Sequence, residues 1–363
     1  MRILLFIDIL GSGGAQRQIV GLAELLCKQG HDVLLLDYWD SVFYDEYLMA
    51  RQIPFEHCLT KGKWNILQMF KRKVESFQPE VVIAYLDSPT IIACLGKLCS
   101  RHKFRLIVSE RNTTQYNNWK TRLRMHLFRL ADVVVPNSYS QQAFIDKNYP
   151  FLHNKVVTIT NMVDTLRFKP AQNKSQNEVS RFVVVGRVVA QKNPLRFIEA
   201  VKLLKEAGYE FRVDWYGDPY PQSYYEQCQK LIQEQDLQAC FQFHPATQDI
   251  VSVYHEADAF VLPSIYEGFP NVLCEAMACG LPVIASNVCD NPHILCDTIN
   301  GYLVNPHDAH DISAKMQQML TLKPEERMQM GLESEKIISE RFSIQSFERA
   351  YNQLIIPSRV HSR

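Results

Sequence analysis

The sequence lacks three features that would each point to a particular class of protein. Its ten cysteines include no CxxC pair and no metal-like spacing, which argues against a zinc module and favours buried, reduced thiols. No run of about 18 apolar residues occurs, so no transmembrane helix is expected. The 39 basic residues balance 39 acidic ones. This balance argues against a dedicated nucleic-acid-binding protein, because such proteins are usually strongly basic.

What the sequence does contain indicates an α/β protein of two domains. The length of 363 residues and an apolar share of 47% allow two sizeable cores. Short apolar runs alternate with amphipathic helical patterns, which is typical of parallel sheets. Strands are expected at 3–7, 33–37, 81–85, 105–109, 133–136 and 156–159, and then at 182–185, 211–216, 241–243, 259–263 and 282–285. Aspartate at position 8 interrupts the first apolar run, which favours a strand over a signal peptide.

The pattern also predicts where the domains begin and end. We expect an N-terminal doubly wound domain at 1–168, a polar linker at 169–180, and a C-terminal doubly wound domain at 181–335. The helical segment 336–363 is expected to pack back on the N-terminal domain. Ligands of doubly wound sheets bind beyond the carboxyl ends of the strands, so the loops at those ends are the ones to inspect.

A glycine-rich loop, GSGGA at residues 11–15, lies between the first expected strand and the first expected helix. Glycines let the backbone approach a ligand closely, and a helix N-terminus offers free N–H groups to an anion. A dinucleotide fingerprint would need a third glycine where Gln16 stands, which disfavours a dehydrogenase. We therefore expect Gly13 and Gly14 to face a phosphate group or the acceptor, with a structural turn as the alternative.

A basic loop, GRVVAQKNP at residues 186–194, follows the first expected strand of the second half. It places Arg187 and Lys192 just before a helix that begins near Pro194, because proline suits the first helical turn. Two cations and a helix N-terminus would together neutralise a diphosphate. Taken alone, the loop is also compatible with a solvated turn carrying incidental charges.

An acidic segment, EGFPNVLCE at residues 267–275, carries two glutamates around a helix start near Pro270. Glu275 lies among apolar neighbours inside this helix and therefore needs a partner or a ligand. A carboxylate can accept both hydroxyls of a ribose, and Glu267 can accept sugar hydroxyls in the same way. The alternative is one solvated and one capping glutamate. Backbone N–H groups free to meet phosphate or sugar oxygens are expected near Phe269, Asn271 and Val272.

The order of these motifs resembles that of the retaining GT-B glycosyltransferases of family 4, and the resemblance covers essentially the whole chain. Each motif is weak alone, but their combination is specific. The resemblance implies a GT-B fold, in which two Rossmann-like, doubly wound domains face a cleft, and hexosyltransferase activity with a UDP-sugar donor. It also implies that no metal or other cofactor is required, and the sequence contains no DxD motif that would hold a metal.

The resemblance also implies that the N-terminal domain, 1–168, binds the acceptor and that the C-terminal domain, 181–335, binds the nucleotide sugar. It further implies roles for individual residues. Arg187 and Lys192 would bind the diphosphate, Glu275 the ribose and Glu267 the donor sugar, while the base would lie against the loop near His244. Retention would proceed by front-face attack, in which the departing phosphate helps to deprotonate the acceptor hydroxyl. The other expected substrate contacts are Gly13, Gly14, Glu110, Gly186, Asn193, Pro245, Gly268, Phe269, Pro270, Asn271 and Val272.

Arg111 departs from the family pattern. It lies in SERN at residues 109–112, where similar transferases that act on lipid-linked oligosaccharides carry a histidine facing the donor sugar. Arginine cannot act as a general base at neutral pH. We expect Arg111 to belong to the catalytic site by binding a phosphate or orienting the sugar, with a salt-bridged structural role as the alternative.

Two basic stretches with aromatic residues, 61–73 and 116–130, indicate a surface that rests on an anionic membrane. Trp64, Phe70, Trp119 and Phe128 are the side chains expected to enter the interface; an ordinary solvated helical face is the alternative. We therefore expect a cytoplasmic protein, peripheral on the inner face of the cytoplasmic membrane. Its acceptor would be a glycan, lipid-linked in the favoured version, in O-antigen, capsule, exopolysaccharide or glycoprotein glycan synthesis.

Two other functions compete with this hypothesis. A GT-B sugar-nucleotide epimerase is disfavoured by the basic loop combined with the two glutamates. A catalytically silent nucleotide-sugar-binding protein is disfavoured by the intact set of charged residues. The donor sugar stays open among UDP-GlcNAc, UDP-GalNAc, UDP-Gal and UDP-Glc, because small changes in the lining loops alter that choice.

Overall fold

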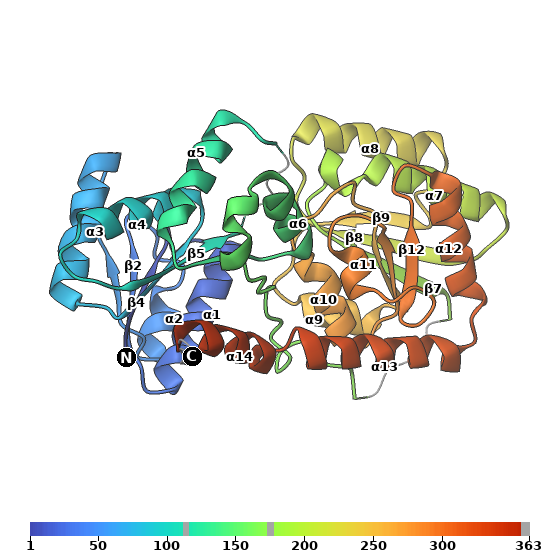
Figure 1. Ribbon diagram of the computed structural model, residues 1–363. Helices are drawn as coiled ribbons and strands as arrows, with labels where there is room; N and C mark the ends of the chain where they lie inside the picture. Colours follow the sequence, from blue (N-terminus) through green and yellow to red (C-terminus); the bar gives the residue numbers. More distant parts are fainter. Residues whose placement is uncertain (112–115, 173–177, 357–363) are drawn as a thin grey trace. The chain divides into compact units, whose positions relative to one another are not determined.

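The computed structural model describes residues 1–111, 116–172 and 178–356 (Figure 1). The chain divides into two compact units. Unit 1 comprises Met1–Asn161 together with the segment from Phe347 onward, and unit 2 comprises Met162–Ser346. The chain therefore passes from one unit to the other twice, at 161/162 and at 346/347.

Unit 1 is built on a six-stranded parallel sheet in the order β3-β2-β1-β4-β5-β6. Its strands are β1 (Arg2–Phe6), β2 (Asp32–Asp37), β3 (Phe55–His57), β4 (Val81–Tyr85), β5 (Arg105–Glu110) and β6 (Val133–Pro136). Its helices are α1 (Gly14–Lys28), α2 (Asp45–Ala50), α3 (Lys63–Phe77), α4 (Asp87–Cys99), α5 (Trp119–Leu127) and α6 (Tyr139–Asn148). The 3-10 turns η1 (Phe128–Leu130) and η2 (Pro150–Lys155) complete it, and α14 (Ile344–Ile355) joins it from the far end of the sequence.

Unit 2 repeats this design with a six-stranded parallel sheet in the order β12-β11-β10-β7-β8-β9. Its strands are β7 (Ser180–Val185), β8 (Phe211–Tyr216), β9 (Phe241–His244), β10 (Ala259–Leu262), β11 (Val283–Ser286) and β12 (Gly301–Val304). Its helices are η3 (Ala190–Lys192), α7 (Pro194–Glu206), α8 (Gln222–Glu234), α9 (Ile250–Glu256), α10 (Asn271–Ala278), α11 (Asn291–Ile294), α12 (Ala309–Thr321) and α13 (Pro324–Arg341).

The central strands are buried on both faces, which explains their continuous apolar sequences. Every residue of β4 and of β10 is buried. In unit 2, one face of the sheet packs with α7, α8 and α12 around Trp215, and the other packs with α9, α10 and α13 around Phe260. The predicted α/β architecture of two Rossmann-like domains is confirmed.

In both sheets the first strand lies next to the fourth, so the chain reverses its direction of progress between β1 and β4 and again between β7 and β10. Loops that leave the carboxyl ends of two such strands diverge and expose a crevice for ligands. In unit 2, the loops in question are those that follow β7 and β10. They carry the basic loop and the acidic segment.

Three details differ from the sequence-based predictions. The edge strands β3 and β12 were not expected, and the stretch 156–159 forms a single bridge, Val134 with Val156, instead of a strand. Phe70 and Phe128, expected at a membrane interface, are fully buried in the core of unit 1. Their helices turn these side chains inward, so the prediction was wrong for both. Among the described residues, no helix is long and apolar enough to cross a membrane.

Candidate active site

The basic loop is fastened to the end of β8 by backbone hydrogen bonds. Gly186 N donates to Tyr216 O at 2.9 Å, and Val188 N donates to Asp218 O at 3.0 Å. Gly217 lies so close to the loop that a Cβ atom there would stand 2.1 Å from the carbonyl oxygen of Gly186. Its φ of +156° also favours glycine. A glycine at position 217 therefore lets the basic loop lie against β8.

The two cations of the basic loop have different surroundings. The side chain of Arg187 is exposed and has no hydrogen-bond or ion-pair partner among the described residues. Lys192 is half-buried, and its Nζ lies 2.5 Å from Oε1 of Glu267. One cation is thus available to an incoming anion, whereas the other is held in place by a carboxylate.

Asn193 lies in the basic loop as the N-cap of α7. It adopts a left-handed conformation with φ of 62°, and α7 begins at Pro194 directly after it. The Nδ2 of Asn193 donates to the carbonyl oxygens of Pro263 at 3.0 Å and Pro306 at 2.7 Å. The buried amide of Asn193 therefore binds protein carbonyls, and it fixes the position at which α7 starts.

The basic loop and the segment after β10 meet at the point where the sheet order reverses. Ile265 N donates to Gln191 O at 2.9 Å, and Gln191 Nε2 donates to Tyr266 O at 2.9 Å. Together with the Lys192–Glu267 ion pair, these bonds join two loops that lie about 75 residues apart in sequence. The structure thus brings together the two motifs that the sequence places in separate loops.

The start of α10 presents free backbone donors next to Glu267. The N–H groups of Gly268, Phe269 and Val272 have no acceptor among the described residues, whereas that of Asn271 donates to Phe269 O at 3.0 Å. The first N–H groups of a helix have no partner within it and carry partial positive charge. The segment 268–272 therefore offers an anion or a sugar oxygen three backbone donors.

Glu275 lies inside α10 and is buried, as the sequence predicted. The pKa of the neighbouring Cys274 thiol is raised well above its ordinary value. Burial is the largest cause, and the charge of Glu275 is the next. Glu267 is buried too, and its backbone N–H points to Cys289 Sγ at 3.5 Å. Both glutamates are thus carboxylates held inside the protein at one end of the sheet of unit 2.

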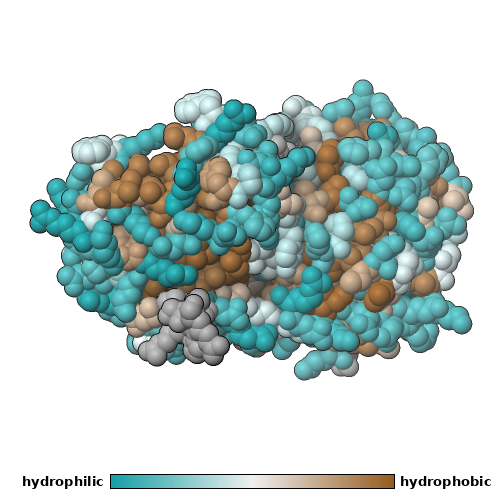
Figure 2. Space-filling model, viewed as in Figure 1, coloured by the Kyte–Doolittle hydropathy of each residue, from teal (hydrophilic) through white to brown (hydrophobic). Residues whose placement is uncertain are grey.

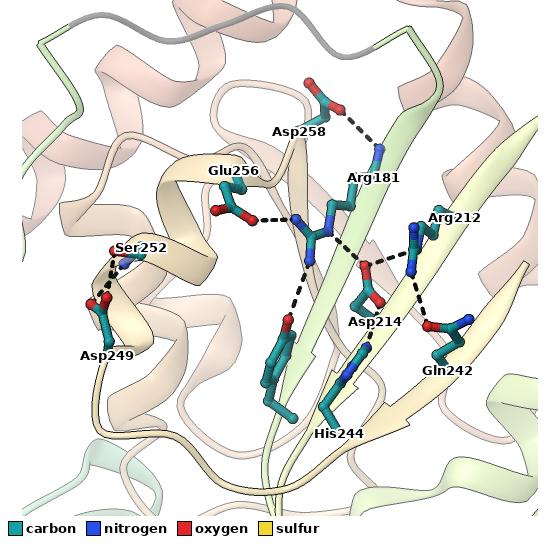
Figure 3. Close-up of polar contacts among 10 residues, drawn as sticks. Arg181, Arg212, Asp214, Gln242, His244, Asp249, Ser252, Glu256 and Asp258 are labelled. Carbon is teal, nitrogen blue, oxygen red and sulfur yellow. Dashed lines mark hydrogen bonds and ion pairs between the residues drawn. The ribbon is translucent and has the colours of Figure 1, made fainter.

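A charged network holds His244 at the end of β9 (Figure 3). Nε2 of His244 lies 2.6 Å from Oδ1 of Asp214, a fully buried residue of β8. The imidazole stacks on the ring of Tyr216, with centroids 4.6 Å apart and planes 17° apart. Arg181 donates from Nε to Asp214 at 2.6 Å and from Nη2 to Tyr216 Oη at 3.2 Å. The ring of His244 is therefore fixed by both a carboxylate and an aromatic face.

This network is continuous with the basic loop. Gly217 N donates to His244 O at 3.0 Å, and Ala246 N donates to Asp218 Oδ1 at 3.2 Å. Pro245 lies between these two anchored positions. The loop at 244–246 and the basic loop are thus both attached to residues 216–218.

The glycine loop of unit 1 is anchored at its start. Asp37, at the end of β2, accepts from Leu10 N at 3.0 Å, and its other carboxylate oxygen lies 2.7 Å from Nδ1 of His57. Ser41 donates from Oγ to Leu10 O at 3.1 Å. Gly13 adopts an extended conformation as the N-cap of α1, and α1 begins at Gly14. The loop thus presents the N-terminus of α1 at the carboxyl end of β1.

Glu110 and Arg111 occupy a different position in unit 1, at the end of β5, which is separated from β1 by β4. Glu110 is buried and accepts from Arg124 Nη2 at 2.8 Å. Arg111 is 8% exposed, and its guanidinium contacts neutral groups only among the described residues. Asn112, the last residue of the SERN motif, lies outside the described residues.

Three contributors to this site were not predicted: Asp214, Tyr216 and Gly217. Asp214 carried a recognisable signal, since it is an acidic residue inside an otherwise apolar strand and must therefore be paired. Tyr216 and Gly217 carried no comparable signal in the sequence. Among the described residues, no group of three or more histidine, cysteine, aspartate or glutamate side chains is arranged to hold a metal ion.

Comparison with protein families identifies the chain. The model described as "Glycosyltransferase Family 4" matches residues 12–167, and the model "Glycosyl transferases group 1" matches residues 166–337. The two matches follow each other along the chain and together span both units. The chain therefore belongs to the group 1, family 4 glycosyltransferases.

Individual relatives and solved structures agree with this assignment. The Escherichia coli "UDP-Gal:alpha-D-GlcNAc-diphosphoundecaprenol alpha-1,3-galactosyltransferase" is 29% identical over 177 residues, which cover 42% of this chain and 42% of that protein. A Campylobacter jejuni N-acetylgalactosaminyltransferase, whose name specifies a diphospho-undecaprenol acceptor, is 24% identical over 78% of this chain and 80% of its own length. The crystal structure of Anabaena HepE in complex with UDP matches with a TM-score of 0.85 at 17% identity, covering 98% of this chain and 99% of that one. The fold is accordingly GT-B.

Proposed function

We propose that this protein transfers a hexose or an N-acetylhexosamine from a UDP-sugar to a glycan acceptor, with retention of anomeric configuration. The observation that carries the proposal is the pairing of two loops where the sheet order of unit 2 reverses. There an arginine without a partner among the described residues, a lysine held by a glutamate, and backbone N–H groups that have no acceptor in the described part of the chain lie on adjoining loops. These are the groups that a nucleotide diphosphate sugar requires.

The proposed roles follow the chemistry of breaking an anomeric C–O bond. The transition state resembles an oxocarbenium ion that separates from a dianionic leaving group, so stabilising the diphosphate is the main electrostatic task. Arg187 and Lys192 would bind the diphosphate, and the N-terminus of α10 would add uncharged donors. Glu275 would accept the ribose hydroxyls, and Glu267 would contact the donor sugar.

The ion pair between Lys192 and Glu267 gives this site a defined state without ligand. The carboxylate of Glu267, the first residue of the acidic segment, holds the ammonium group of Lys192. A diphosphate would therefore meet a lysine that is already in position, which lowers the entropic cost of binding. Retention and the absence of a metal requirement are carried by the family resemblance, and both belong to the proposal.

The acceptor is proposed to be a glycan on a lipid diphosphate, used in the assembly of a bacterial surface polysaccharide. This proposal draws on the relatives from Escherichia coli and Campylobacter jejuni, whose names specify undecaprenyl diphosphate acceptors. The first of these relatives shares less than half of its length with the chain. The acceptor class therefore needs its own experiment.

Release of UDP tests the function. The purified protein is incubated with UDP-GlcNAc, UDP-GalNAc, UDP-Gal or UDP-Glc, with and without a sugar linked to undecaprenyl diphosphate. We expect one donor to give UDP release that depends on the acceptor, together with a lengthened glycan whose new linkage keeps the donor's anomeric configuration. Binding of a donor without any UDP release would instead identify a silent binding protein. Conversion of the donor into an isomer without acceptor would identify an epimerase.

A membrane-facing surface on unit 1 is the second part of the proposal, with corrected residues. Trp64 at the start of α3 and Trp119 at the start of α5 are 69% and 70% exposed, and Lys61, Lys63 and Lys120 lie next to them. Exposed tryptophan and lysine side chains suit the interface of an anionic bilayer. Hydrophilic residues dominate the visible face of the molecule, with apolar patches between them (Figure 2). The exposed tryptophans beside lysines therefore say more about a membrane-facing surface than the general hydropathy of this face does.

We expect the protein to sediment with vesicles containing anionic lipid at low salt, because each exposed cation near the surface contributes about 1 kcal/mol. The double variant W64S/W119S should reduce the vesicle-bound fraction at least about fivefold, since it removes both interfacial side chains. Tyr220→Ser in unit 2, where the tyrosine is equally exposed, is the matched control and should bind like the wild type. Equal sedimentation of all three proteins, or no binding at low salt, would remove the membrane part of the proposal.

A further inference from the structure

The guanidinium of Arg111 contacts residues from three separate parts of unit 1. Nη1 donates to Asn161 Oδ1 at 2.8 Å, and Nη2 donates to Tyr85 Oη at 2.5 Å and to Tyr351 Oη at 2.8 Å. The guanidinium carbon also lies 4.2 Å from the centroid of the Tyr85 ring. The two phenol oxygens lie 2.6 Å from each other. Arg111 thus binds three buried polar side chains, while its own Nε has no hydrogen-bond partner among the described residues.

All members of this set are buried, and the acceptors are two phenol oxygens and one amide oxygen. Tyr85 and Tyr351 are fully buried, Asn161 is 5% exposed, and Arg111 is 8% exposed. Burial raises the pKa of Tyr85 well above its ordinary value, so the phenol stays neutral. Hydrogen bonds to three acceptors and the contact with the Tyr85 ring fix the position of the buried guanidinium. Loss of one partner would leave a buried polar group unsatisfied.

Two of the three partners mark the places where the chain leaves unit 1. Asn161 is the last residue of unit 1 before the first passage to unit 2, and Tyr351 lies in α14, through which the chain returns. On the unit 2 side, the two connections are paired with each other, since Val163 N donates to Phe342 O at 2.8 Å and Val163 bridges to Ser343. Each connection is therefore fixed on both sides of the boundary, and Met162 alone separates the fixed points of the first one.

We propose that Arg111 is a positioning residue that ties both connections between the units to the carboxyl end of β5. The Arg111 set, comprising Arg111, Asn161, Tyr85 and Tyr351, therefore couples the two connections to each other through the end of β5. It replaces the catalytic role that the sequence suggested for Arg111, and its consequence for turnover rests on the proposed function.

Two roles of Arg111, direct contact with the substrate and tying of the connections, predict different effects of substitutions at its partners. If Arg111 contacts the substrate, then removing Tyr351 Oη or the Asn161 side chain should leave turnover almost unchanged, because neither of those residues would touch the substrate. If Arg111 acts by tying the connections, then each of these changes should reproduce the loss seen on substituting Arg111. Donor binding should be unaffected if Arg111 acts by tying the connections, whereas loss of a direct contact between Arg111 and the donor in R111M should weaken it.

The experiment compares R111M, Y351F and N161A with R105M as the matched control. Arg105 donates from Nε to Leu354 O at 2.9 Å, so it also fastens α14 to unit 1 but contacts no member of the Arg111 set. We expect R111M, Y351F and N161A each to lower kcat about tenfold. In all three, KM for the donor and Kd for UDP should stay within about twofold of wild type. R105M should keep wild-type turnover. The double variant R111M/Y351F should lose no more than R111M alone, because both changes break the same set.

Hydrogen exchange separates this inference from the proposed function. Amides at 161–165 and 343–351 should exchange at least about tenfold faster in Y351F than in R105M, whether or not the protein turns over a UDP-sugar. Y351F deletes a single oxygen, so it keeps the test usable if R111M does not fold. The inference is overturned if Y351F and N161A leave both exchange and kcat at wild-type values. It is also overturned if R105M changes exchange and kcat as much as Y351F and N161A do. Absence of turnover in the wild type, with the exchange result intact, would count against the proposed function alone.

Discussion

Replacing Arg187 or Lys192 by alanine is expected to lower kcat/KM at least about 100-fold, which corresponds to roughly 2.7 kcal/mol of transition-state stabilisation. Each cation would face the diphosphate as negative charge develops on the leaving group, and such preorganised charges contribute more in the transition state than in the bound substrate. The measurement is acceptor-dependent UDP release under conditions in which kcat/KM is obtained directly.

The two variants differ in what else they disturb, and that difference makes them useful together. Arg187 is exposed without a described partner, so its loss should leave the thermal midpoint nearly unchanged. Lys192→Ala leaves the buried Glu267 carboxylate without its cation and should lower stability as well as activity. A lost activity in R187A at normal stability is therefore the cleaner result.

Arg196 supplies the control for these variants. It lies in the first turn of α7, just beyond the basic loop, and forms an exposed pair with Glu199 at 2.6 Å. Arg196→Ala should keep wild-type kcat/KM and stability, because exposed pairs of this kind contribute little. Near-normal turnover in both R187A and K192A would refute the assignment of the basic loop to the diphosphate.

The sequence allowed much of the fold to be predicted because its central strands are continuous apolar runs. Buried parallel strands such as β4 and β10 leave that signature whatever their neighbours are. The strands that were missed, β3 and β12, lie at sheet edges and have three and four residues. β3 is only half-buried and β12 begins with glycine, so neither forms a distinct apolar run. The short parallel bridge at Val156 shows the opposite error, in which an apolar run does not extend into a strand.

Helical phase would have corrected the prediction about aromatic residues at a membrane. In α3 the buried residues are Ile66, Leu67, Phe70 and Val74, a spacing that places them on one face. Trp64 lies off that face and is exposed. Basic and aromatic composition identified the right stretch of sequence, but only the periodicity distinguishes the residues that face the core from those that face outward.

The candidate site could be predicted as a set of motifs but not as a set of contacts. The loops after β7 and β10 were recognisable from glycine, proline and charge. That Lys192 pairs with Glu267, and that Asn193 binds two carbonyls, depends on tertiary contacts between distant segments. Arg111 is the extreme case, because its partner Tyr351 lies 240 residues away. A pattern of residue types cannot reveal which buried acceptor a guanidinium will find.

Replacing Asp214 by asparagine is expected to lower the free energy of unfolding by about 3 kcal/mol. Asp214 is fully buried in β8, and its carboxylate lies 2.6 Å from Arg181 Nε and 2.6 Å from His244 Nε2 (Figure 3). Burial alone would lower the pKa of Arg181, but hydrogen bonds from its guanidinium to Asp214 and Glu256 outweigh burial and raise that pKa above its ordinary value. Asparagine would remove the charge that balances Arg181 and leave a partly buried cation without its main partner.

Glu256 provides a control that shares the same arginine. It pairs with Arg181 Nη1 at 2.5 Å, but its own side chain is 62% exposed. Glu256→Gln should therefore cost less than about 1 kcal/mol, because water screens an exposed pair. Urea unfolding can be followed by the fluorescence of Trp215, which is fully buried in the same strand as Asp214. Equal stability of D214N and E256Q would show that the buried carboxylate is not what holds the network together.

The same pair of variants tests what the network does for the donor. D214N removes the carboxylate that fixes the ring of His244, whereas E256Q leaves that contact intact. If the loop at 244–246 receives the base, KM for the UDP-sugar should rise several-fold in D214N and stay at the wild-type value in E256Q, with kcat nearly unchanged in both. This pattern would place the effect in binding of the nucleotide, because the reacting bond lies at the diphosphate and not at the base. A fall in kcat at constant KM would instead mean that the network supports the position of the basic loop, to which it is joined through residues 216–218.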